Sequence, residues 1–322
     1  MNEKLSDSGQ LFCCSEMREG TSCYVNETSE KTGKEVLMSL LNENEKSRIS
    51  FGECLTAVHE KTPLIHNITN YVTVNDVANA LLACGGSPIM SDEPKDVYEI
   101  TSICGGLNIN IGTLNERSIE AMMIAGSRAK ELAHVILLDP VGAGASTLRT
   151  TTAQTIVEKI KPDVIRGNIS EIKTLAKGSG TTKGVDADAA DTVTEENLDE
   201  MVAFVKAFAE KTNAVIAITG AIDLVADADI CYVIRNGRKE MSRITGTGCQ
   251  LSSVATAYAV ANPEHKVDAV AAAVCLMGLA GEIGWEKMQE GDGNSTYRNR
   301  IIDAIFNMDA KTLEAGAKYE IR

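Results

Sequence analysis

From about residue 54 onward, short apolar runs alternate with longer segments in which apolar positions recur every three or four residues. The first pattern predicts buried strands and the second predicts amphipathic helices. We expect strands at 63–65, 87–90, 107–111, 135–139, 164–166, 214–219, 223–226 and 231–235. We expect helices at 74–83, 115–131, 151–161, 195–211, 250–261 and 267–286.

This alternation of strand and helix predicts an α/β fold, with a mostly parallel central sheet covered by helices on both faces. The last two strands are joined closely enough to run antiparallel. No internal repeat or linker divides residues 51–322, so we expect a single domain there. Ligands of such sheets bind beyond the carboxyl ends of the strands, in the loops that lead into helices.

Residues 1–50 have a different composition, rich in Ser, Glu, Asn, Lys and Thr and without sustained periodicity. Such segments bury too little apolar surface to order themselves. We expect a poorly ordered N-terminal extension.

Composition excludes several classes of protein. Of the 322 residues, 44% are hydrophobic and 24% are charged, as in ordinary globular proteins. The net charge of −14 argues against binding to nucleic acid, which depends on Lys and Arg meeting phosphate. No apolar run approaches the roughly 18 residues of a membrane span, so we expect no membrane association.

The nine cysteines are scattered, and the chain has only four histidines. No pair of cysteines has zinc-ligand spacing, and the first residues have neither a signal-peptide pattern nor a transit-peptide pattern. A reduced, cytoplasmic protein is the simplest interpretation.

Two loops that follow predicted strands contain residues suited to a phosphate and its cation. In "DPVGAGAS", Asp139 ends a strand, and in "RGNISE", Arg166 ends another while Asn168 and Glu171 open a helix. Carboxylate and amide oxygens together with phosphates are the ligands that Mg²⁺ prefers. The alternative is structural, with Asp139 capping a turn and Glu171 a favourable acid in a first helical turn.

Two further loops fall on the same predicted edge. "AITGAID" places Thr219 at the end of a strand, and "TGTGC" places Gly246, Thr247 and Gly248 before a helix that begins near Cys249. Backbone amides in such a turn, with the positive end of the helix dipole, form an anion hole. The same field is expected to lower the pKa of the Cys249 thiol. The alternative is a small buried cysteine that only packs.

With these loops in place, the chain from about residue 54 to 309 resembles the hydroxyethylthiazole kinase family, which has the ribokinase-like fold. The resemblance rests on segments in the order that the family has them, "PLIHNITNYVTVNDVANALLACGGSPIM", "NINIGTL", "LDPVGAGAS", "IRGNISEI", "KGVDA", "VIAITGAIDLVAD" and "ITGTGC". It implies transfer of the ATP γ-phosphoryl group to the primary hydroxyl of 4-methyl-5-(2-hydroxyethyl)thiazole, with Mg²⁺. It also implies a homotrimer whose substrate pockets lie between subunits.

By motif, the resemblance assigns the site residues. ATP would contact Arg166 and Thr219, the substrate would contact Met90, Gly246 and Asn67 (with Thr69, on the first loop), and the metal would be held by Asp139 and Glu171. Cys249 stands where related sugar kinases have an aspartate as base. Because a thiol is mostly protonated near neutral pH and a nearby γ-phosphate raises its pKa, we expect Cys249 to contribute only modestly to the rate.

Two other functions fit part of the pattern. A kinase of the same fold that acts on hydroxymethylpyrimidine or pyridoxal would share the ending "GTGC". A non-catalytic oligomer that binds nucleotide or thiazole would share the glycine-rich loops, but it would not need the metal-positioning acids Asp139 and Glu171.

Overall fold

The computed structural model describes residues 48–177 and 192–322, and contacts group Arg48–Arg322 into one unit. Residues 1–47, and with them nearly all of the predicted N-terminal extension, lie outside the described residues, as does the segment "KGVDA".

Nine strands form one sheet in the order β2-β1-β3-β4-β5-β6-β7-β8-β9. The strands from β2 through β6 pair in parallel, and β7, β8 and β9 add antiparallel pairs at the other end. Their bounds are β1 Leu64–Ile68, β2 Ser87–Met90, β3 Gly106–Asn110, β4 Val135–Asp139, β5 Val164–Gly167, β6 Val215–Ile218, β7 Asp223–Ala226, β8 Cys231–Ile234 and β9 Tyr319–Ile321. The predicted α/β class is therefore confirmed.

Strand β4 shows why its sequence is apolar throughout. Val135 and Leu137 belong to the core on one face of the sheet, while Ile136 and Leu138 belong to the core on the other. A strand covered on both faces needs apolar side chains at every position. Asp139, the last residue of this strand, is therefore a conspicuous exception.

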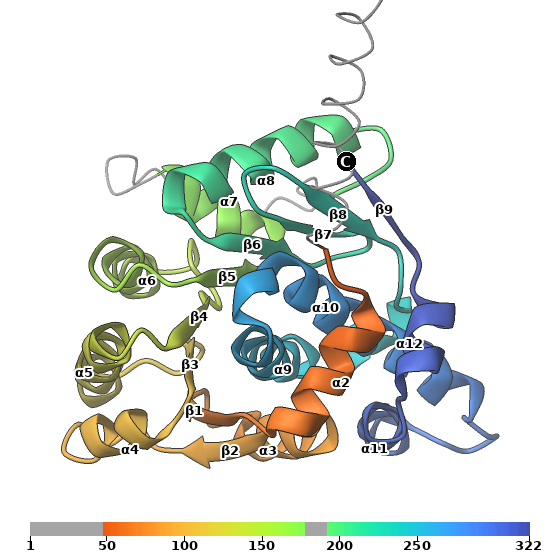
Figure 1. The fold of residues 1–322 in the computed structure, drawn as a ribbon, viewed down its shortest axis with the longest axis horizontal. Coiled ribbons are helices and arrows are strands. Elements are labelled where there is room, and N and C mark those ends of the chain that lie inside the picture. Colours follow the sequence, from red (N-terminus) through yellow and green to blue (C-terminus); the bar gives the residue numbers. More distant parts are fainter. Residues whose placement is uncertain (1–47, 178–191) are drawn as a thin grey trace, which may run out of the picture. The chain divides into compact units, whose positions relative to one another are not determined.

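Helices cover both faces of the sheet (Figure 1). The first face is covered by α2 Phe51–Lys61, α3 Val74–Ala83, α9 Thr247–Ala261, α10 Lys266–Glu286, α11 Asn294–Phe306 and α12 Ala310–Gly316. The second is covered by α4 Val97–Ile103, α5 Glu116–Glu131, α6 Thr147–Lys159, α7 Ile169–Lys177 and α8 Leu198–Thr212. Two short 3₁₀ helices, η1 Lys239–Arg243 and η2 Pro263–His265, precede α9 and α10.

The differences from prediction lie mainly at element ends. Helix α6 begins four residues earlier than expected, because the Ser146 hydroxyl caps it by accepting a hydrogen bond from the Arg149 amide at 3.3 Å. Strand β1 continues through Ile68, so Asn67 lies in a strand and not on the first loop as predicted. Helices α2, α4, α11 and α12 and strand β9 were not among the predicted elements.

One helical stretch, Pro263–Glu286, is long and apolar enough to cross a membrane, with a mean hydropathy of 1.7 in its most apolar window. However, 83% of that window is buried inside the protein. Within α10, residues 269–281 are buried without a break. A helix that is apolar all round is expected in the core of a large domain, and α10 has that place here.

Candidate active site at the carboxyl edge of the sheet

The carboxyl ends of the parallel strands bring the predicted residues to one edge. Asn110 ends β3 and is the register partner of Asp139, which ends β4. Arg166 is the penultimate residue of β5, and Thr219 follows β6 directly. The amino end of α9 meets the same group, because the Ser252 hydroxyl donates to Asp139 Oδ2 at 2.8 Å.

Asp139 is completely buried, and its two oxygens differ. Oδ2 accepts hydrogen bonds from Asn110 Nδ2 and Ser252 Oγ, both at 2.8 Å, and lies 3.6 Å from Arg166 Nη1. Oδ1 is buried without a hydrogen-bond partner among the described residues. Burial raises the pKa of this carboxyl, although Arg166 and the two hydrogen bonds act in the opposite direction.

The Arg166 guanidinium connects its own loop with the other three. Its Nη2 donates to Thr219 Oγ1 at 2.5 Å, and its Nη1 pairs with Asp139. A Cβ atom at Gly248 would lie 2.5 Å from Nη1, so a side chain there would displace the guanidinium from its present position. The structure thus brings Asp139, Arg166, Thr219 and Gly248 together.

Glu171 joins two of the loops. Its Oε1 accepts from the Gly142 amide and its Oε2 accepts from the Asn168 amide, both at 2.8 Å. Burial raises its pKa, and the negative charge of Asp139 raises it further, whereas the two amides lower it. Glu171 lies in the first turn of α7, as in the structural alternative, and it also joins the Gly142 loop to that helix. Its carboxylate lies near Asp139 as well.

The amino end of α9 has the shape expected of an anion hole. The first intrahelical bond runs from the Gln250 amide to the Gly246 carbonyl at 2.9 Å, so the amides of Thr247, Gly248 and Cys249 precede the helical ladder. Gly246 caps the helix with φ of 86°, in the left-handed region, and a Cβ atom there would lie 2.3 Å from Cγ2 of Thr73. Both facts require glycine.

Cys249 is held from one side by Asn70, whose Nδ2 donates to Sγ at 3.2 Å. The predicted lowering of its thiol pKa is wrong: burial raises this pKa, with the negative charge of Asp139 as the next cause. Hydrogen bonds from Asn110 and Thr73 and the charge of Arg166 oppose the rise without reversing it. Desolvation therefore outweighs the contributions that lower the pKa, and the thiol is protonated near neutral pH.

A chain of buried side chains around Cys249 was not predicted. Asn70 Nδ2 also donates to Asn110 Oδ1 at 3.3 Å, while Asn70 Oδ1 accepts from the Thr73 hydroxyl at 3.0 Å. Asn110 in turn donates to Asp139. The sequence signal was the polar "NIN" at the end of an apolar strand, but the partners come from loops far apart in the chain.

A cavity of about 540 Å³ opens beside Arg166, Thr219 and Gly248 and extends between α10 and the segment that includes η1. Asp223, also missed from the sequence, lines it and accepts a hydrogen bond from the Gly220 amide at 2.8 Å. Burial raises the pKa of Asp223 to about 7, against a lowering effect of Arg166. The volume is within the range of small-molecule and cofactor sites.

Met90 and Asn67, the two predicted substrate residues near the β2 end of the sheet, differ in burial. Met90 ends β2 and is half-buried. Asn67 is only 1% exposed, and its Oδ1 accepts from Ser253 Oγ at 2.7 Å and from Asn108 Nδ2 at 3.0 Å. These contacts fix α9 on the sheet. Because the amide is buried and bonded within the protein, Asn67 does not form an exposed substrate wall in this chain alone.

The donor set at this edge fits a hard cation. Asp139 Oδ1 is an unpaired carboxylate oxygen, and the Glu171 carboxylate lies near it. Among the described residues there is no group of three or more His, Cys, Asp or Glu side chains that could form a metal cage. Mg²⁺ in phosphate-binding sites needs only one or two carboxylates beside water and phosphate oxygens, so the two acids are sufficient.

Comparison with known proteins shows the family to which this chain belongs. The model of the hydroxyethylthiazole kinase family matches residues 55–311. The hydroxyethylthiazole kinase of Clostridium acetobutylicum is 58% identical over 268 residues, which are 83% of this chain and 98% of that protein. The enzyme of the same name from Clostridium tetani is 44% identical over 265 residues, 82% of this chain and 95% of that protein.

Solved structures are similar in fold. The hydroxyethylthiazole kinase of Pyrococcus horikoshii aligns with a TM-score of 0.75 at 31% identity and covers 84% of this chain and 98% of its own. A pyridoxal kinase from Staphylococcus aureus in complex with ADP aligns with a TM-score of 0.56 at 14% identity, covering 80% and 97%. The second likeness concerns the fold alone, which is that of the ribokinase-like kinases.

Proposed function

The chain belongs to the hydroxyethylthiazole kinase family, and we propose that it transfers the γ-phosphoryl group of ATP to the primary hydroxyl of 4-methyl-5-(2-hydroxyethyl)thiazole in thiamine biosynthesis or salvage. The observation that carries the proposal is the meeting of Asp139, Arg166 and the amino end of α9 at one edge of the sheet. Phosphoryl transfer depends on alignment and neutralisation of charge, and this edge supplies both.

We place ATP in the cavity of about 540 Å³ beside Thr219, with its phosphates directed toward Arg166 and the amides of Thr247 and Gly248. The guanidinium is already oriented by Thr219 and Asp139, so it needs little reorganisation to bind a phosphate. The start of α9 adds backbone donors and the positive end of a helix dipole.

Mg²⁺ would be held by Asp139 and Glu171, directly or through water, and would neutralise the charge of the ATP phosphates. Asp139 suits this role because its oxygen Oδ1 has no hydrogen-bond partner among the described residues, while Arg166 pairs with the other oxygen, Oδ2. Glu171 holds the loop at Gly142 and the start of α7 at Asn168, so it also keeps the two acid-bearing loops together.

We propose that Cys249 faces the acceptor hydroxyl and helps its proton to leave. Asn70 donates to Sγ, so the S–H bond is free to point away from Asn70. A thiol whose pKa is raised is a weak base, and its contribution to the rate is therefore modest. We place Gly246, three residues before Cys249, in the same region; it packs against Thr73 too closely for a side chain.

A homotrimer with substrate pockets between subunits is supported by the surface near β2. Five of the nine large apolar side chains exposed among the described residues belong to residues 71–103, namely Tyr71, Val72, Leu82, Tyr98 and Ile103. This segment surrounds the edge strand β2, which ends at Met90. Clustered exposed apolar residues mark interaction surfaces, and a neighbour there would complete the site around Met90.

Sedimentation equilibrium tests the assembly. Val72→Glu, at a residue 74% exposed, should dissociate the trimer and remove turnover at low protein concentration. Phe306→Glu is the matched control, because Phe306 is 70% exposed on α11, outside residues 71–103. A trimer that survives Val72→Glu would contradict the assignment of this surface.

The function itself is tested by two measurements on the wild-type protein. ADP release is followed with Mg·ATP and the thiazole alcohol, and thermal shifts are recorded with each substrate separately. Turnover is expected; stabilisation by both substrates without ADP release would instead favour a non-catalytic binding oligomer. A cytoplasmic location is also proposed, supported by the six described cysteines, all of which are free thiols.

A further inference from the structure

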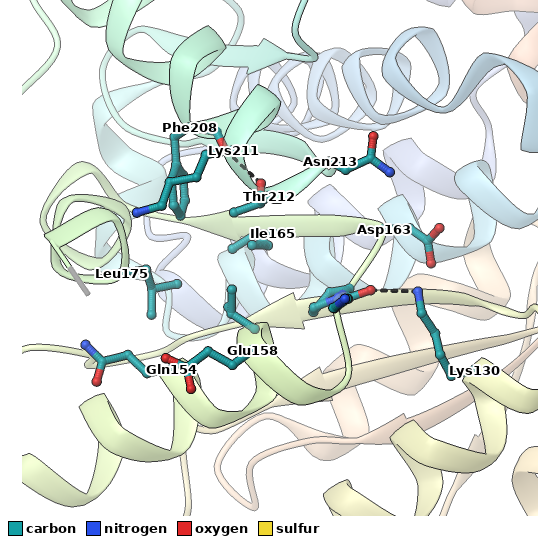
Figure 2. Close-up of a pocket in the computed structure, with 13 residues that line it drawn as sticks. Lys130, Gln154, Glu158, Asp163, Ile165, Leu175, Phe208, Lys211, Thr212 and Asn213 are labelled. Atoms are coloured by element: carbon teal, nitrogen blue, oxygen red, sulfur yellow. Dashed lines mark hydrogen bonds between the residues drawn. The ribbon is translucent and has the colours of Figure 1, made fainter. Parts of the chain in front are cut away.

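A second cavity of about 530 Å³ lies away from the proposed active site, beside the amino end of β5 and between α6 and α8 (Figure 2). Asp163, which directly precedes β5, and Asn213, which caps the carboxyl end of α8, line it. None of the residues that line this cavity also lines the cavity beside Thr219. A molecule bound here would therefore not compete directly with ATP.

The floor of this cavity is apolar. Ile165 is fully buried, Phe208 is 4% exposed and Leu175 is 6% exposed, and all three line the cavity. Figure 2 shows them entering from β5, α8 and α7 respectively. A floor formed by an aromatic ring and branched aliphatic side chains suits a small flat apolar ring.

One buried polar side chain lines the same cavity without a partner. Gln154 on α6 is 7% exposed, and no described residue exchanges a hydrogen bond with its amide. The amide itself remains accessible, since its atoms are not among the fully buried polar atoms without a partner in the described residues. Gln154 thus offers donors and an acceptor to a molecule in the cavity.

The rim is positively charged although the whole chain is acidic. The charged residues that line the cavity are three lysines, Lys130, Lys161 and Lys211, and two acids, Glu158 and Asp163. Asp163 is engaged elsewhere, because its carboxylate accepts from the Ile136 amide at 3.0 Å and lies 3.9 Å from Lys266 Nζ.

Two of the rim lysines donate hydrogen bonds to main-chain carbonyl groups, but these bonds do not neutralise their charge. Lys130 Nζ donates to the Lys161 carbonyl at 2.7 Å, the dashed line that leaves Lys130 in Figure 2. Lys211 Nζ donates to the Ala176 carbonyl at 3.4 Å. Each ammonium keeps further protons for a ligand.

We propose that this cavity is a binding site for an aromatic ring that carries one phosphate ester, with the ring on the Phe208–Ile165 floor and the phosphate at the lysine rim. The ligand could be the phosphorylated product of this enzyme or another aromatic phosphate, and both share the recognised chemistry.

The test uses phenyl phosphate as the probe, followed by saturation-transfer NMR and by titration on the full-length protein saturated with a non-hydrolysable ATP analogue. Binding is expected to persist with the nucleotide site filled. Benzyl alcohol, which lacks the anion, and inorganic phosphate, which lacks the ring, should each bind at least tenfold more weakly.

Two variants locate the site. Lys211→Glu reverses one exposed rim charge and should weaken phenyl phosphate about tenfold, and Gln154→Leu should weaken it at unchanged rim charge. Lys159→Glu is the matched control, because Lys159 is exposed on α6 but does not line the cavity. It should leave the affinity within twofold of wild type.

Unchanged affinity in Lys211→Glu, or loss of binding when the ATP analogue is present, would overturn the proposal. Displacement of the probe by phosphorylated thiazole would identify the product as a ligand of this site. Failure of displacement, with the same sensitivity to Lys211→Glu, would assign the site to another aromatic phosphate. Both of these outcomes support the site.

Discussion

Gly246 allows a prediction in which two physical costs can be separated. Its φ of 86° lies in the left-handed region, where a side chain costs about 1–2 kcal/mol. A Cβ atom would also lie 2.3 Å from Cγ2 and 2.8 Å from Cβ of Thr73. Relief of such overpacking typically costs about 1–3 kcal/mol. Gly246→Ala should therefore lower the free energy of unfolding by about 2–5 kcal/mol.

Thr73 cannot simply move aside. It is 3% exposed, and both its amide and its hydroxyl donate to Asn70 Oδ1, at 3.1 and 3.0 Å. Because Asn70 also contacts Cys249, a shift of Thr73 would disturb the site as well as the packing. Gly246→Ala should thus reduce kcat in addition to stability.

Two other glycines provide matched controls. Gly291 has φ of 90° but nothing within 4 Å of an added Cβ, so Gly291→Ala should cost only the conformational term of about 1–2 kcal/mol. Gly293 caps α11 as Gly246 caps α9, but its φ is −125° and its surroundings are open. Gly293→Ala should change stability by no more than about 0.5 kcal/mol.

Urea titrations give the free energy of unfolding of each of the three glycine variants, provided that its dependence on urea concentration is the same in all of them. Steady-state kinetics gives kcat. The double variant Thr73→Ser with Gly246→Ala removes the closest atom, Cγ2, and should recover part of the loss. If Gly246→Ala cost no more than Gly291→Ala, crowding against Thr73 would not be the reason for glycine at this position.

Three further predictions concern charge and protonation. Cys249→Ala should lower kcat by about 10²-fold or less in single-turnover experiments, because its raised thiol pKa makes it a weak base; an unchanged rate would remove it from proton transfer. Arg166→Met should lower the free energy of unfolding by about 3–5 kcal/mol, because it leaves buried Asp139 unpaired. Adding Asp139→Asn should restore stability in urea but not turnover. If the double variant did not regain stability, the ion pair would not be the cause of the loss. Asp223, with a folded pKa of about 7, binds its proton more tightly than the unfolded chain, so its contribution to stability falls as pH rises from about 4 to 7. Asp223→Asn should gain stability relative to wild type as pH rises across that window. A difference in urea midpoint between the two proteins that stays the same at pH 4.5, 6 and 7.5 would refute this.

The fold class followed from the sequence because each element has a local signature. Strand β4 is apolar at every position except its last, so Asp139 is conspicuous in the sequence. Helix starts were less accurate: α6 was placed at 151, although Ser146 caps a start at Thr147. Strand β9 and helix α12 lacked a strong pattern because they are short.

The candidate site was predicted only in part. Asp139, Arg166 and Thr219 are predicted from the loops, and parallel strand ends bring them to one edge, where they meet Gly248 at the start of α9. The Asn70–Asn110 contact could not be predicted, because its partners are 40 residues apart and join only through tertiary packing.

Two properties of site residues were misjudged. The predicted lowering of the Cys249 pKa is wrong, since helix position is visible in a sequence but burial is not. Asn67 was placed on a loop, although it lies within β1 and is bonded to Ser253.

The central claim, that this edge phosphorylates a thiazole alcohol, is tested most directly by a panel of acceptors. Phosphorylation with Mg·ATP would be measured for the thiazole alcohol, hydroxymethylpyrimidine, pyridoxal and ribose under identical conditions. We predict the highest kcat/KM for 4-methyl-5-(2-hydroxyethyl)thiazole. A higher kcat/KM for hydroxymethylpyrimidine, pyridoxal or ribose, or no turnover of the thiazole alcohol, would contradict it.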